Sequence, residues 1–424
     1  MRDGRPARVL FVNDTARNGG PGRSLHAILK FLDPGRVHRR VVLPRPGPVA
    51  DLLRDVAEEV HFEPGIVENP IEPWSRPMQR GDYRAPAAVR WTRAAGNVTR
   101  VGGALARLVR TVRAERFDLI YCNGTSAAFA GGAVAAVTGV PALWHCRYTS
   151  LPAVARRPHH ALSASDAVKR VLCVSRAVTP LFAHCSPKVR VVPNGLDVEA
   201  FDPLRVRGQL RAELGLGPDA IVFGSHGRVL RRKGYLEMVA AARMAFESMD
   251  ASTRRRLHFV VVGDTPDDFE KDHVAECRAA AREAGLADRF RMLGFRADVR
   301  PLVVDFDVAV VPSVYADPLP RSVIESMALG RPVVAFGVGG VPEMLQDGEQ
   351  GEVIPFTSGD GGTGAAADAV ARLARSFVRY ATDADRRARQ GAAGRARVLA
   401  AFDARVHSRA IEEEIVAASG TGRR

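Results

Sequence analysis

The sequence alternates between short runs rich in β-branched residues and longer segments with helical patterning. Residues 8–13 (RVLFVN) form one such run, and it passes through the glycine-rich turn DTARNGGPGRS into the helical pattern LHAILKFL. Residues 118–123 (DLIYCN) and 170–175 (RVLCVS) repeat the apolar run. This alternation is typical of parallel sheets whose connections are helices. We therefore predict an α/β protein built from parallel sheets.

The apolar runs fall into two series, which predicts two domains. The first series ends at residues 189–197 (VRVVPNGLD), and the second opens at 220–229 (AIVFGSHGRV). The later runs of the second series are 258–264, 289–295, 307–313, 331–340 and 351–356. A chain of 424 residues is long for one core, and two domains of roughly 200 residues are expected. The turn residues PNGLD mark the boundary between domains 1–195 and 196–400, and a break in the last helical stretch around AAFDARV precedes the final segment 401–424.

Composition is that of a globular chain in a reducing compartment. Apolar residues make up 46% and charged residues 25%, and no apolar run reaches the roughly 18 residues of a membrane span. Met1–Arg8 lead straight into the first strand pattern, so we expect no signal peptide. The five cysteines contain no CxxC pair, which favours reduced, buried thiols in a cytoplasmic protein and argues against metal binding through cysteine.

The net charge of +14 admits two interpretations. Only 5 of the 61 basic residues are lysine, which favours the general arginine enrichment of a GC-rich bacterial genome. The alternative is a surface for an anionic partner. Arg107, Arg110 and Arg113 have helical spacing in the arginine-dense segment 76–116, so they predict either a solvated helix face or a face for an anionic membrane or acceptor. The basic residues are not interleaved with aromatic ones, so we expect no nucleic-acid partner.

Two glycine-containing turns are candidates for binding a phosphate. In GSHGRVLRRKG, Arg228 and Lys233 follow the first strand of the second series, and two cations at the mouth of a parallel sheet form a diphosphate clamp. Arg231 and Arg232 are expected to be solvated. In NGGPGRS, Gly19 and Gly20 precede a helix and let backbone amides approach an anionic or hydroxylated ligand. This turn lacks the GxGxxG spacing of a dinucleotide site.

Two carboxylates flank the start of a predicted helix in PSVYADPLPRSVIESMALG (312–330). Asp317 lies on the loop, and the helix runs from Ser322 to Leu329. The free backbone amides at Arg321 and Ser322 are further candidate donors to the phosphate that Arg228 and Lys233 would bind. Glu325 either accepts hydrogen bonds from ribose hydroxyls or stabilises its own helix dipole, and the sequence leaves both roles open.

A histidine ends another strand pattern in the first series. His145 follows the apolar run PALW, and ligand sites of α/β proteins collect at the carboxyl ends of strands. A single histidine is more often structural than functional, so both roles stay open.

Taken together, these motifs resemble the retaining nucleotide-sugar glycosyltransferases of family four, which have the GT-B fold. The resemblance rests on NGGPGRS, His145, VLCVS, VVPNGLD, GRVLRRKG, VVVGD, MLGF, the two acids with seven residues between them, and GGVPE (339–343). It implies two Rossmann-like domains that face each other across a cleft. The first would bind the acceptor and the second the donor nucleotide, and the C-terminal helix (401–424) would pack back on the first domain.

The resemblance also implies roles for individual residues. Arg228 and Lys233 would neutralise the departing diphosphate, Glu325 would bind the ribose, and Asp317 would lie near the transferred sugar. The other implied ligand-binding residues are Gly19 and Gly20 beside the donor phosphate and the acceptor, His145 near the reacting sugar, and Phe295 beside the base. The implied activity is retaining transfer from a UDP- or GDP-sugar to a hydroxyl of a saccharide, a lipid-linked acceptor or a small molecule. Neither a metal nor a cofactor is implied.

The chain departs, around the first acid, from the pattern of the family that it resembles. Family members commonly have glutamate, then proline or glycine, phenylalanine and glycine, whereas this chain has Asp317, Pro318, Leu319 and Pro320. Pro320 has neither the flexibility nor the amide donor of glycine. Either the sugar subsite is reshaped or catalysis is impaired, and a catalytically silent nucleotide-binding scaffold is therefore the alternative function.

Overall fold

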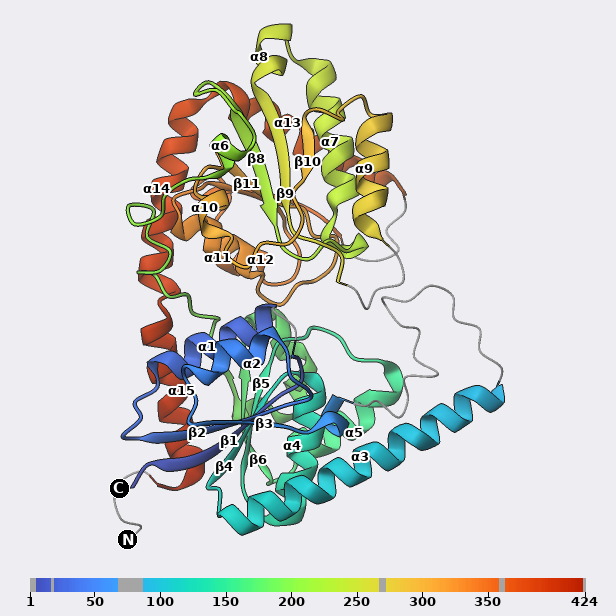
Figure 1. Ribbon diagram of the computed structural model, residues 1–424, viewed down its shortest axis with the longest axis vertical. Helices are drawn as coiled ribbons and strands as arrows, with labels where there is room; N and C mark the ends of the chain where they lie inside the picture. Colours follow the sequence, from blue (N-terminus) through green and yellow to red (C-terminus); the bar gives the residue numbers. More distant parts are fainter. Residues whose placement is uncertain (1–4, 17–18, 68–86, 267–271, 358–362, 422–424) are drawn as a thin grey trace. The chain divides into compact units, whose positions relative to one another are not determined.

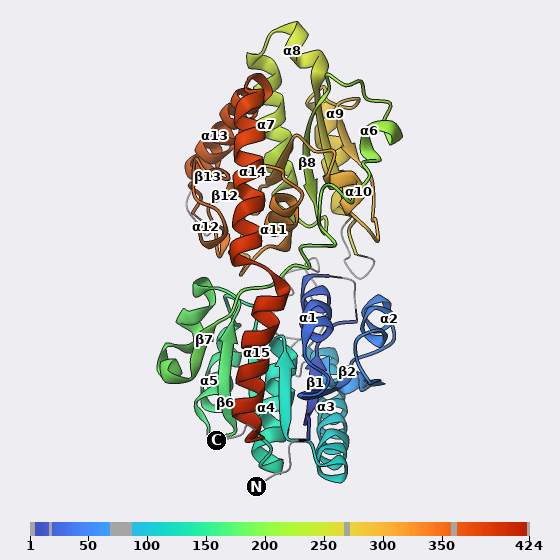
Figure 2. The same ribbon diagram turned by 90° about the vertical axis from the view of Figure 1, so that its left-hand side faces the viewer.

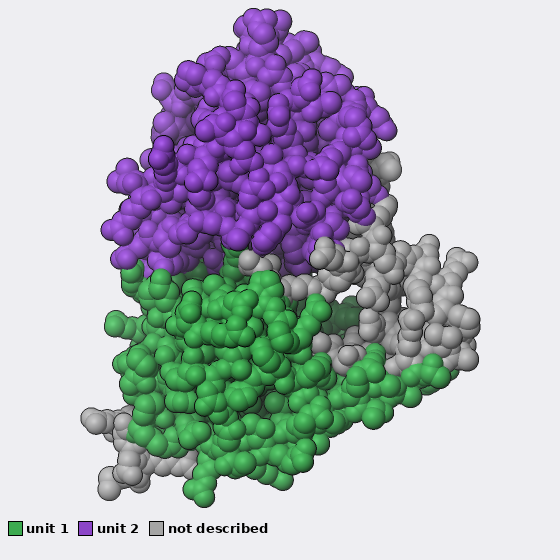
Figure 3. Space-filling view, in the orientation of Figure 1, with its two compact units in different colours: residues 1–78, 82–195, 404–424 green, residues 79–81, 196–403 purple. Residues whose placement is uncertain are grey.

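The computed structural model describes residues 5–16, 19–67, 87–266, 272–357 and 363–421. The described residues divide into two compact units, which Figure 3 shows in different colours. The first unit holds the residues up to Gly195 together with those from Ala404, and the second holds Leu196–Asp403.

A seven-stranded sheet forms the centre of the first unit. Its strands lie in the order β3-β2-β1-β4-β5-β6-β7, and every pair of neighbours is parallel. β1, β4, β5 and β6 are mostly apolar because helices cover both faces of the sheet. The strands are β1 (Ala7–Asn13), β2 (Val37–Leu43), β3 (Glu59–Phe62), β4 (Leu119–Asn123), β5 (Ala142–Cys146), β6 (Val168–Cys173) and β7 (Val189–Val191).

The C-terminal helix α15 (Ala404–Ser419) belongs to the first unit. Figure 2 shows it beside α1 (Gly20–Phe31), and Ile411 and Ile415 join the apolar cluster that α1 forms with the sheet. Glu412 accepts a hydrogen bond from the amide of Asp33 at 2.7 Å, which fixes the end of α1 to α15. The other helices of this unit are α2 (Pro48–Arg54), η1 (Pro64–Val67), α3 (Ala87–Glu115), α4 (Thr125–Thr138), α5 (Ala153–Ala164) and η2 (Arg176–Lys188).

The second unit is built around a six-stranded parallel sheet with the order β10-β9-β8-β11-β12-β13. Its strands are β8 (Ile221–His226), β9 (Leu257–Val262), β10 (Phe290–Met292), β11 (Val308–Val311), β12 (Val333–Phe336) and β13 (Gly351–Ile354). Its helices are α6 (Leu210–Glu213), η3 (Arg231–Lys233), α7 (Tyr235–Ser248), α8 (Ala251–Arg256), α9 (His273–Glu283), α10 (Arg300–Val303), α11 (Arg321–Ala328), α12 (Val341–Met344), α13 (Thr363–Thr382) and α14 (Ala384–Ala401). Figure 1 shows helices on both sides of this sheet.

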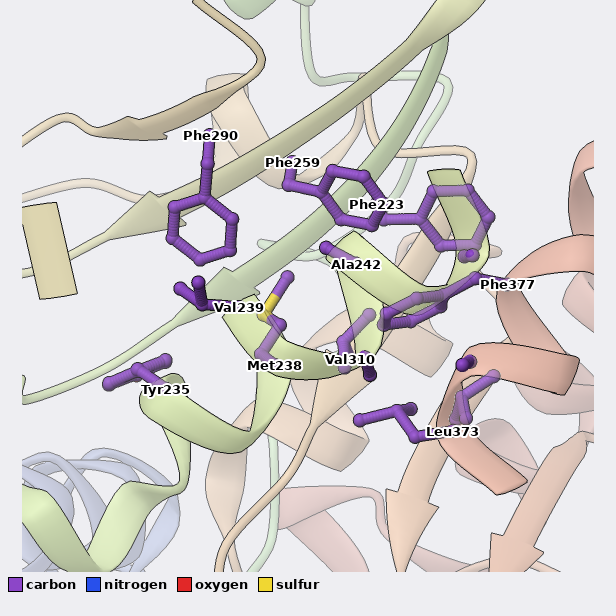
Figure 4. Close-up of a cluster of buried hydrophobic side chains, with 14 of the residues drawn as sticks. Phe223, Tyr235, Met238, Val239, Ala242, Phe259, Phe290, Val310, Leu373 and Phe377 are labelled. Atoms are coloured by element: carbon purple, nitrogen blue, oxygen red, sulfur yellow. The ribbon is translucent and has the colours of Figure 1, made fainter. Parts of the chain in front are cut away.

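Aromatic side chains dominate the core of the second unit. Phe223 and Phe259, from neighbouring strands, stack with their ring centroids 5.4 Å apart, and Phe377 of α13 packs 4.9 Å from Phe223. Figure 4 shows these rings against Met238 and Val239 of α7. Such rings bury a large apolar area each, which anchors α7 and α13 to the same face of the sheet.

The predicted α/β class is confirmed, because each predicted strand run contains an observed strand of a parallel sheet. The helix predicted from Ser322 to Leu329 is α11, one residue earlier at both ends. The prediction of reduced, buried thiols also agrees with the structure, in which all five cysteines are free and buried. Among the described residues, no helix is long and apolar enough to cross a membrane.

Candidate functional site

The strand order of the second sheet brings two of the predicted motifs together. β8 lies between β9 and β11, so the chain leaves the adjacent strands β8 and β11 in opposite directions along the sheet. Ligands of parallel α/β sheets bind at such a switch point, beyond the carboxyl ends of the strands. The turn with Arg228 and Lys233 follows β8, and the loop with Asp317 follows β11. The topology therefore explains why these motifs form one site.

Gly234 allows these two segments to approach each other closely. Its φ of +75° is in the left-handed region, and a Cβ at this position would lie 1.7 Å from the carbonyl oxygen of Pro312. The amide of Val314 donates to the carbonyl oxygen of Arg232 at 3.0 Å. Only glycine fits at Gly234, and the backbone contacts on either side hold the cationic turn against the loop after β11.

Lys233 and Asp317 form an ion pair at the centre of this site. Lys233 Nζ lies 2.7 Å from Asp317 Oδ2, and the side chains are 17% and 13% exposed. The hydroxyl of Tyr315 donates to the same carboxylate oxygen at 2.7 Å. Burial disfavours the charge on Asp317, but Lys233 and the hydrogen bonds outweigh it and lower the pKa of Asp317. Burial likewise opposes the charge on Lys233, and the attraction of Asp317 nevertheless raises the pKa of Lys233. Both groups are therefore charged at neutral pH.

Arg228 and Arg232 add two guanidinium groups to the site. Both are half-buried, and the guanidinium carbon of Arg232 lies 4.6 Å from the centroid of the Tyr315 ring. The prediction that Arg232 is solvated is wrong, because the ring covers its guanidinium. Burial, and then the nearby charge of Arg232, lower the pKa of Arg228. Arg231 is exposed and pairs with Glu237, as expected for a surface residue.

Glu325 is buried within α11 at 4% exposure. His226 Nε2 lies 3.0 Å from its Oε2, and Arg321 Nε donates to its Oε1 at 2.9 Å. His226 ends β8, so Glu325 also lies at the switch point. Glu325 therefore contacts a histidine and an arginine in addition to lying in its own helix, and both contacts hold its carboxylate in place.

The other two donor-site candidates of the second unit are Phe295 and Ser322. Phe295 is 54% exposed and follows Gly294, whose carbonyl oxygen accepts from the amide of Gly263 at 2.9 Å. Ser322 is half-buried in the first turn of α11. Gly340 donates its amide to the carbonyl oxygen of Asp317 at 2.9 Å. The GGVPE segment therefore fixes the loop that carries Asp317.

The predicted glycines of the first unit follow β1, and the switch point of this unit's own sheet lies between β1 and β4. Gly19 and Gly20 begin α1, and both are half-exposed. Asn123, which ends β4, donates to Asn13 Oδ1 at 2.6 Å and to the carbonyl oxygen of Pro21 at 3.2 Å. These bonds hold the glycine turn close to the ends of both strands.

His145 is buried at 1% exposure, at the end region of β5. Its Nδ1 contacts the hydroxyl of Tyr121 and lies 3.2 Å from Arg147 Nη2. Among the described residues its Nε2 has no hydrogen-bond partner. Burial, followed by the charge of Arg147, holds the pKa of His145 well below its usual value. His145 is therefore a neutral, buried histidine, and Arg147 is one of its polar contacts.

Arg147 contacts polar side chains from three segments of the first unit, and no sequence motif singled it out. Its Nε donates to Asn123 Oδ1 at 2.8 Å, and its Nη1 contacts Asn194 Oδ1. The sequence places Arg147 two residues after His145, and this proximity was the only feature of the sequence that pointed to Arg147 as a site residue. Tyr315 was likewise overlooked, although it lies two residues before Asp317. In both cases the role depends on side chains from distant segments.

Eight of the sequence-predicted residues fall into two groups. Arg228, Lys233, Asp317, Arg321 and Glu325 converge in the second unit around the carboxyl ends of β8 and β11. Gly19, Gly20 and His145 belong to the first unit. Within the described parts of the chain, no three histidine, cysteine or acidic residues are arranged to hold a metal ion.

Comparisons with known proteins identify the protein family to which the chain belongs. Residues 220–376 match the family described as glycosyl transferases group 1, and residues 18–200 match glycosyltransferase family 4. The chain is 32% identical over 309 residues to the 2-deoxystreptamine glucosyltransferase of Streptomyces kanamyceticus, covering 67% of this chain and 73% of that protein. The chain belongs to the group 1 glycosyltransferases, so the resemblance seen in the motifs is confirmed.

Further relatives and solved structures support the same class. The chain is 30% identical over 249 residues to the alpha-maltose-1-phosphate synthase of Mycobacterium tuberculosis, covering 56% of this chain and 60% of that protein. Its fold is similar to that of Anabaena HepE, solved in complex with UDP and glucose, with a TM-score of 0.76, 22% identity, and coverage of 97% of this chain and 100% of that one. A glycosyltransferase from Rickettsia africae gives a TM-score of 0.72 at 15% identity, covering 97% and 98%. The two α/β units have the GT-B fold.

Proposed function

We propose that this glycosyltransferase moves a sugar from a UDP- or GDP-sugar to a hydroxyl of a saccharide, a lipid-linked acceptor or a small molecule, with retention at the anomeric carbon. The cluster of Arg228, Arg232 and Lys233 at the switch point of the second sheet carries the proposal. Two of these cations lack a carboxylate partner among the described residues. Uncompensated, half-buried guanidinium groups favour a diphosphate ligand.

The chemistry needs charge stabilisation at the leaving group. The bond between the anomeric carbon and the β-phosphate oxygen breaks, and the acceptor oxygen forms the new bond on the same face of the sugar. The acceptor proton passes to the departing phosphate. Fixed cations stabilise the charge that develops on that phosphate, so this mechanism requires neither a metal ion nor a cofactor beyond the nucleotide sugar. Asp317, paired with Lys233, and Glu325 then position ligands and do not act as a general acid and base.

In this proposal the second unit binds the donor and the first binds the acceptor. Glu325 and Phe295 would hold the nucleoside, and the amides of Arg321 and Ser322 would bind the diphosphate. Gly19 and Gly20 would contact the donor phosphate and the acceptor, and His145 would lie near the reacting sugar. The UDP and glucose bound to HepE, a protein of similar fold, support a nucleotide-sugar donor.

A catalytically silent scaffold is the alternative function, favoured by the departure at Asp317–Pro320. A scaffold would bind the nucleotide sugar without converting it. Release of nucleoside diphosphate from a nucleotide sugar, and its loss in Arg228→Ala, is the experiment that separates the two functions.

A peripheral association with an anionic membrane from the cytoplasmic side is a separate proposal. Its support is α3, where Trp91 is 67% exposed and Arg100 and Arg110 are also exposed. Three arginines of the helix have partners within the unit, because Arg100 contacts Asn97, Arg107 pairs with Glu63 and Arg113 donates to the carbonyl oxygen of Val137. Residues 76–86 of the predicted segment lie outside the described residues.

We expect the protein to sediment with phosphatidylglycerol-containing liposomes at low salt, and Arg100→Gln/Arg110→Gln to sediment less. The reason is that each basic residue near an anionic surface contributes about 1 kcal/mol to binding, which salt screens. Liposomes of neutral lipid are the control. Equal sedimentation of the wild type with both kinds of liposome would contradict the association.

A further inference from the structure

We propose that Arg232 is a third phosphate-binding cation, which makes the site selective for a nucleoside diphosphate over a nucleoside monophosphate. This inference rests on the proposed function and assigns its leaving-group specificity to a particular residue. Arg232 precedes Lys233 directly and belongs to the three-residue helix η3.

The position of Arg232 is fixed by the loop after β11. Its guanidinium carbon lies 4.6 Å from the centroid of the Tyr315 ring, and its carbonyl oxygen accepts from the amide of Val314 at 3.0 Å. Lys233 Nζ lies 5.2 Å from the same ring centroid. Tyr315 therefore holds two cations side by side, while its hydroxyl is bonded to Asp317. A planar guanidinium on an aromatic ring keeps its edge available for hydrogen bonds.

The charges around Arg232 do not balance. The cluster contains three cations, which are Arg228, Arg232 and Lys233. Its one carboxylate, Asp317, forms an ion pair with Lys233. Among the described residues, neither Arg228 nor Arg232 forms an ion pair, and the Nε of Arg232 is buried without a hydrogen-bond partner. The proximity of Arg232 contributes to the lowered pKa of Arg228. Two guanidinium groups that repel each other are stabilised by an anion between or beside them.

The excess of two positive charges matches a diphosphate. A sugar-linked diphosphate carries two negative charges, and it gains a third when the glycosidic bond breaks. An additional cation therefore stabilises the departing group more strongly than the intact donor, which is the requirement for catalysis. A nucleoside monophosphate lacks the second phosphate, so it makes fewer contacts with the cluster.

Isothermal titration calorimetry with UDP, UMP, GDP and GMP tests the inference. For Arg232→Gln we expect the affinity for the better-bound diphosphate to fall by roughly 10-fold or more, because the lost contact is a charge-assisted hydrogen bond. The affinity for the matching monophosphate should change by less than about threefold. Arg232→Lys should retain an intermediate preference, since it keeps the charge and loses the planar fork. Arg231→Gln is the matched control, because Arg231 is exposed and paired with Glu237.

An unchanged ratio of diphosphate to monophosphate affinity in both Arg232→Gln and Arg232→Lys would overturn the inference. If Arg228→Ala weakens diphosphate binding and Arg232→Gln does not, the proposed function stands and only the role of Arg232 fails. If the wild type binds none of the four nucleotides, the proposed function and the inference fail together.

Discussion

Lys233→Met is expected to reduce sugar transfer by roughly 100-fold or more, because removing one fixed charge at a developing anion has a cost of this size. It should also reduce the free energy of unfolding by about 3 kcal/mol. The second effect follows from the ion pair, in which Lys233 Nζ lies 2.7 Å from Asp317 Oδ2 with both side chains mostly buried. Initial rates and urea unfolding at neutral pH measure the two effects separately.

The pH dependence of stability gives Lys233→Met a sharper test. Because the pKa of Asp317 is lowered in the folded protein, its stabilising contribution is present above the unfolded pKa and is lost as the pH falls through the folded pKa. The difference in unfolding free energy between wild type and Lys233→Met should therefore shrink on acidification below about pH 4. Arg231→Met is the control for loss of a neighbouring charge. A difference that stays constant with pH, or unchanged transfer, would contradict the role of Lys233.

Glu325→Gln is expected to weaken binding of the nucleotide sugar by roughly 10-fold, because a carboxylate accepts stronger hydrogen bonds from hydroxyl groups than an amide does. The near-isosteric amide can still accept from Arg321 Nε, so the fold should be retained. Calorimetry with the nucleotide sugar and with the free base separates the ribose contact from the rest of the site.

Glu325→Leu distinguishes the ligand role of Glu325 from its structural role. Without a carboxylate, His226 and Arg321 lose a buried partner, and we expect the free energy of unfolding to fall by about 3–5 kcal/mol. If Glu325→Gln binds the nucleotide sugar as tightly as the wild type while Glu325→Leu is destabilised, Glu325 is structural only.

The sequence predicted the fold well because parallel α/β sheets have a strong local signal. Runs such as RVLFVN are buried on both faces, so they are apolar throughout, and β1 occupies Ala7–Asn13. The order of the strands depends on long-range pairing that no local pattern contains. That order places Arg228 next to the loop of Asp317, and it appeared only in the structure.

The candidate site was predicted less completely, because its geometry depends on contacts between segments. Lys233 was singled out by residue type and spacing, but its pairing with Asp317 requires the approach at Gly234, where a Cβ would lie 1.7 Å from Pro312. Arg232 was expected in solvent because nothing in RRK distinguishes its middle residue. Only the Tyr315 ring, 4.6 Å away, shows that it is covered.

The prolines that depart from the family pattern fit the observed loop. Pro320 is the N-cap residue of α11, with φ −66°, at a position where a backbone N–H has no partner within the helix. Leu319 is buried, and the carbonyl oxygen of Asp317 accepts from Gly340. The loop is thus held without the glycine that the family commonly has.

Donor turnover by the wild type and by Arg228→Ala tests the proposed function most directly. A thermal-shift panel of UDP- and GDP-sugars first identifies the nucleotide sugar that stabilises the fold, because a ligand bound only by the native state raises the melting temperature. Release of nucleoside diphosphate is then followed by chromatography, and the anomeric configuration of the product by NMR. We predict turnover with retention, and a loss of roughly 100-fold in Arg228→Ala. Stabilisation of the fold by a nucleotide sugar that the wild type never cleaves would contradict the transferase function and identify a scaffold.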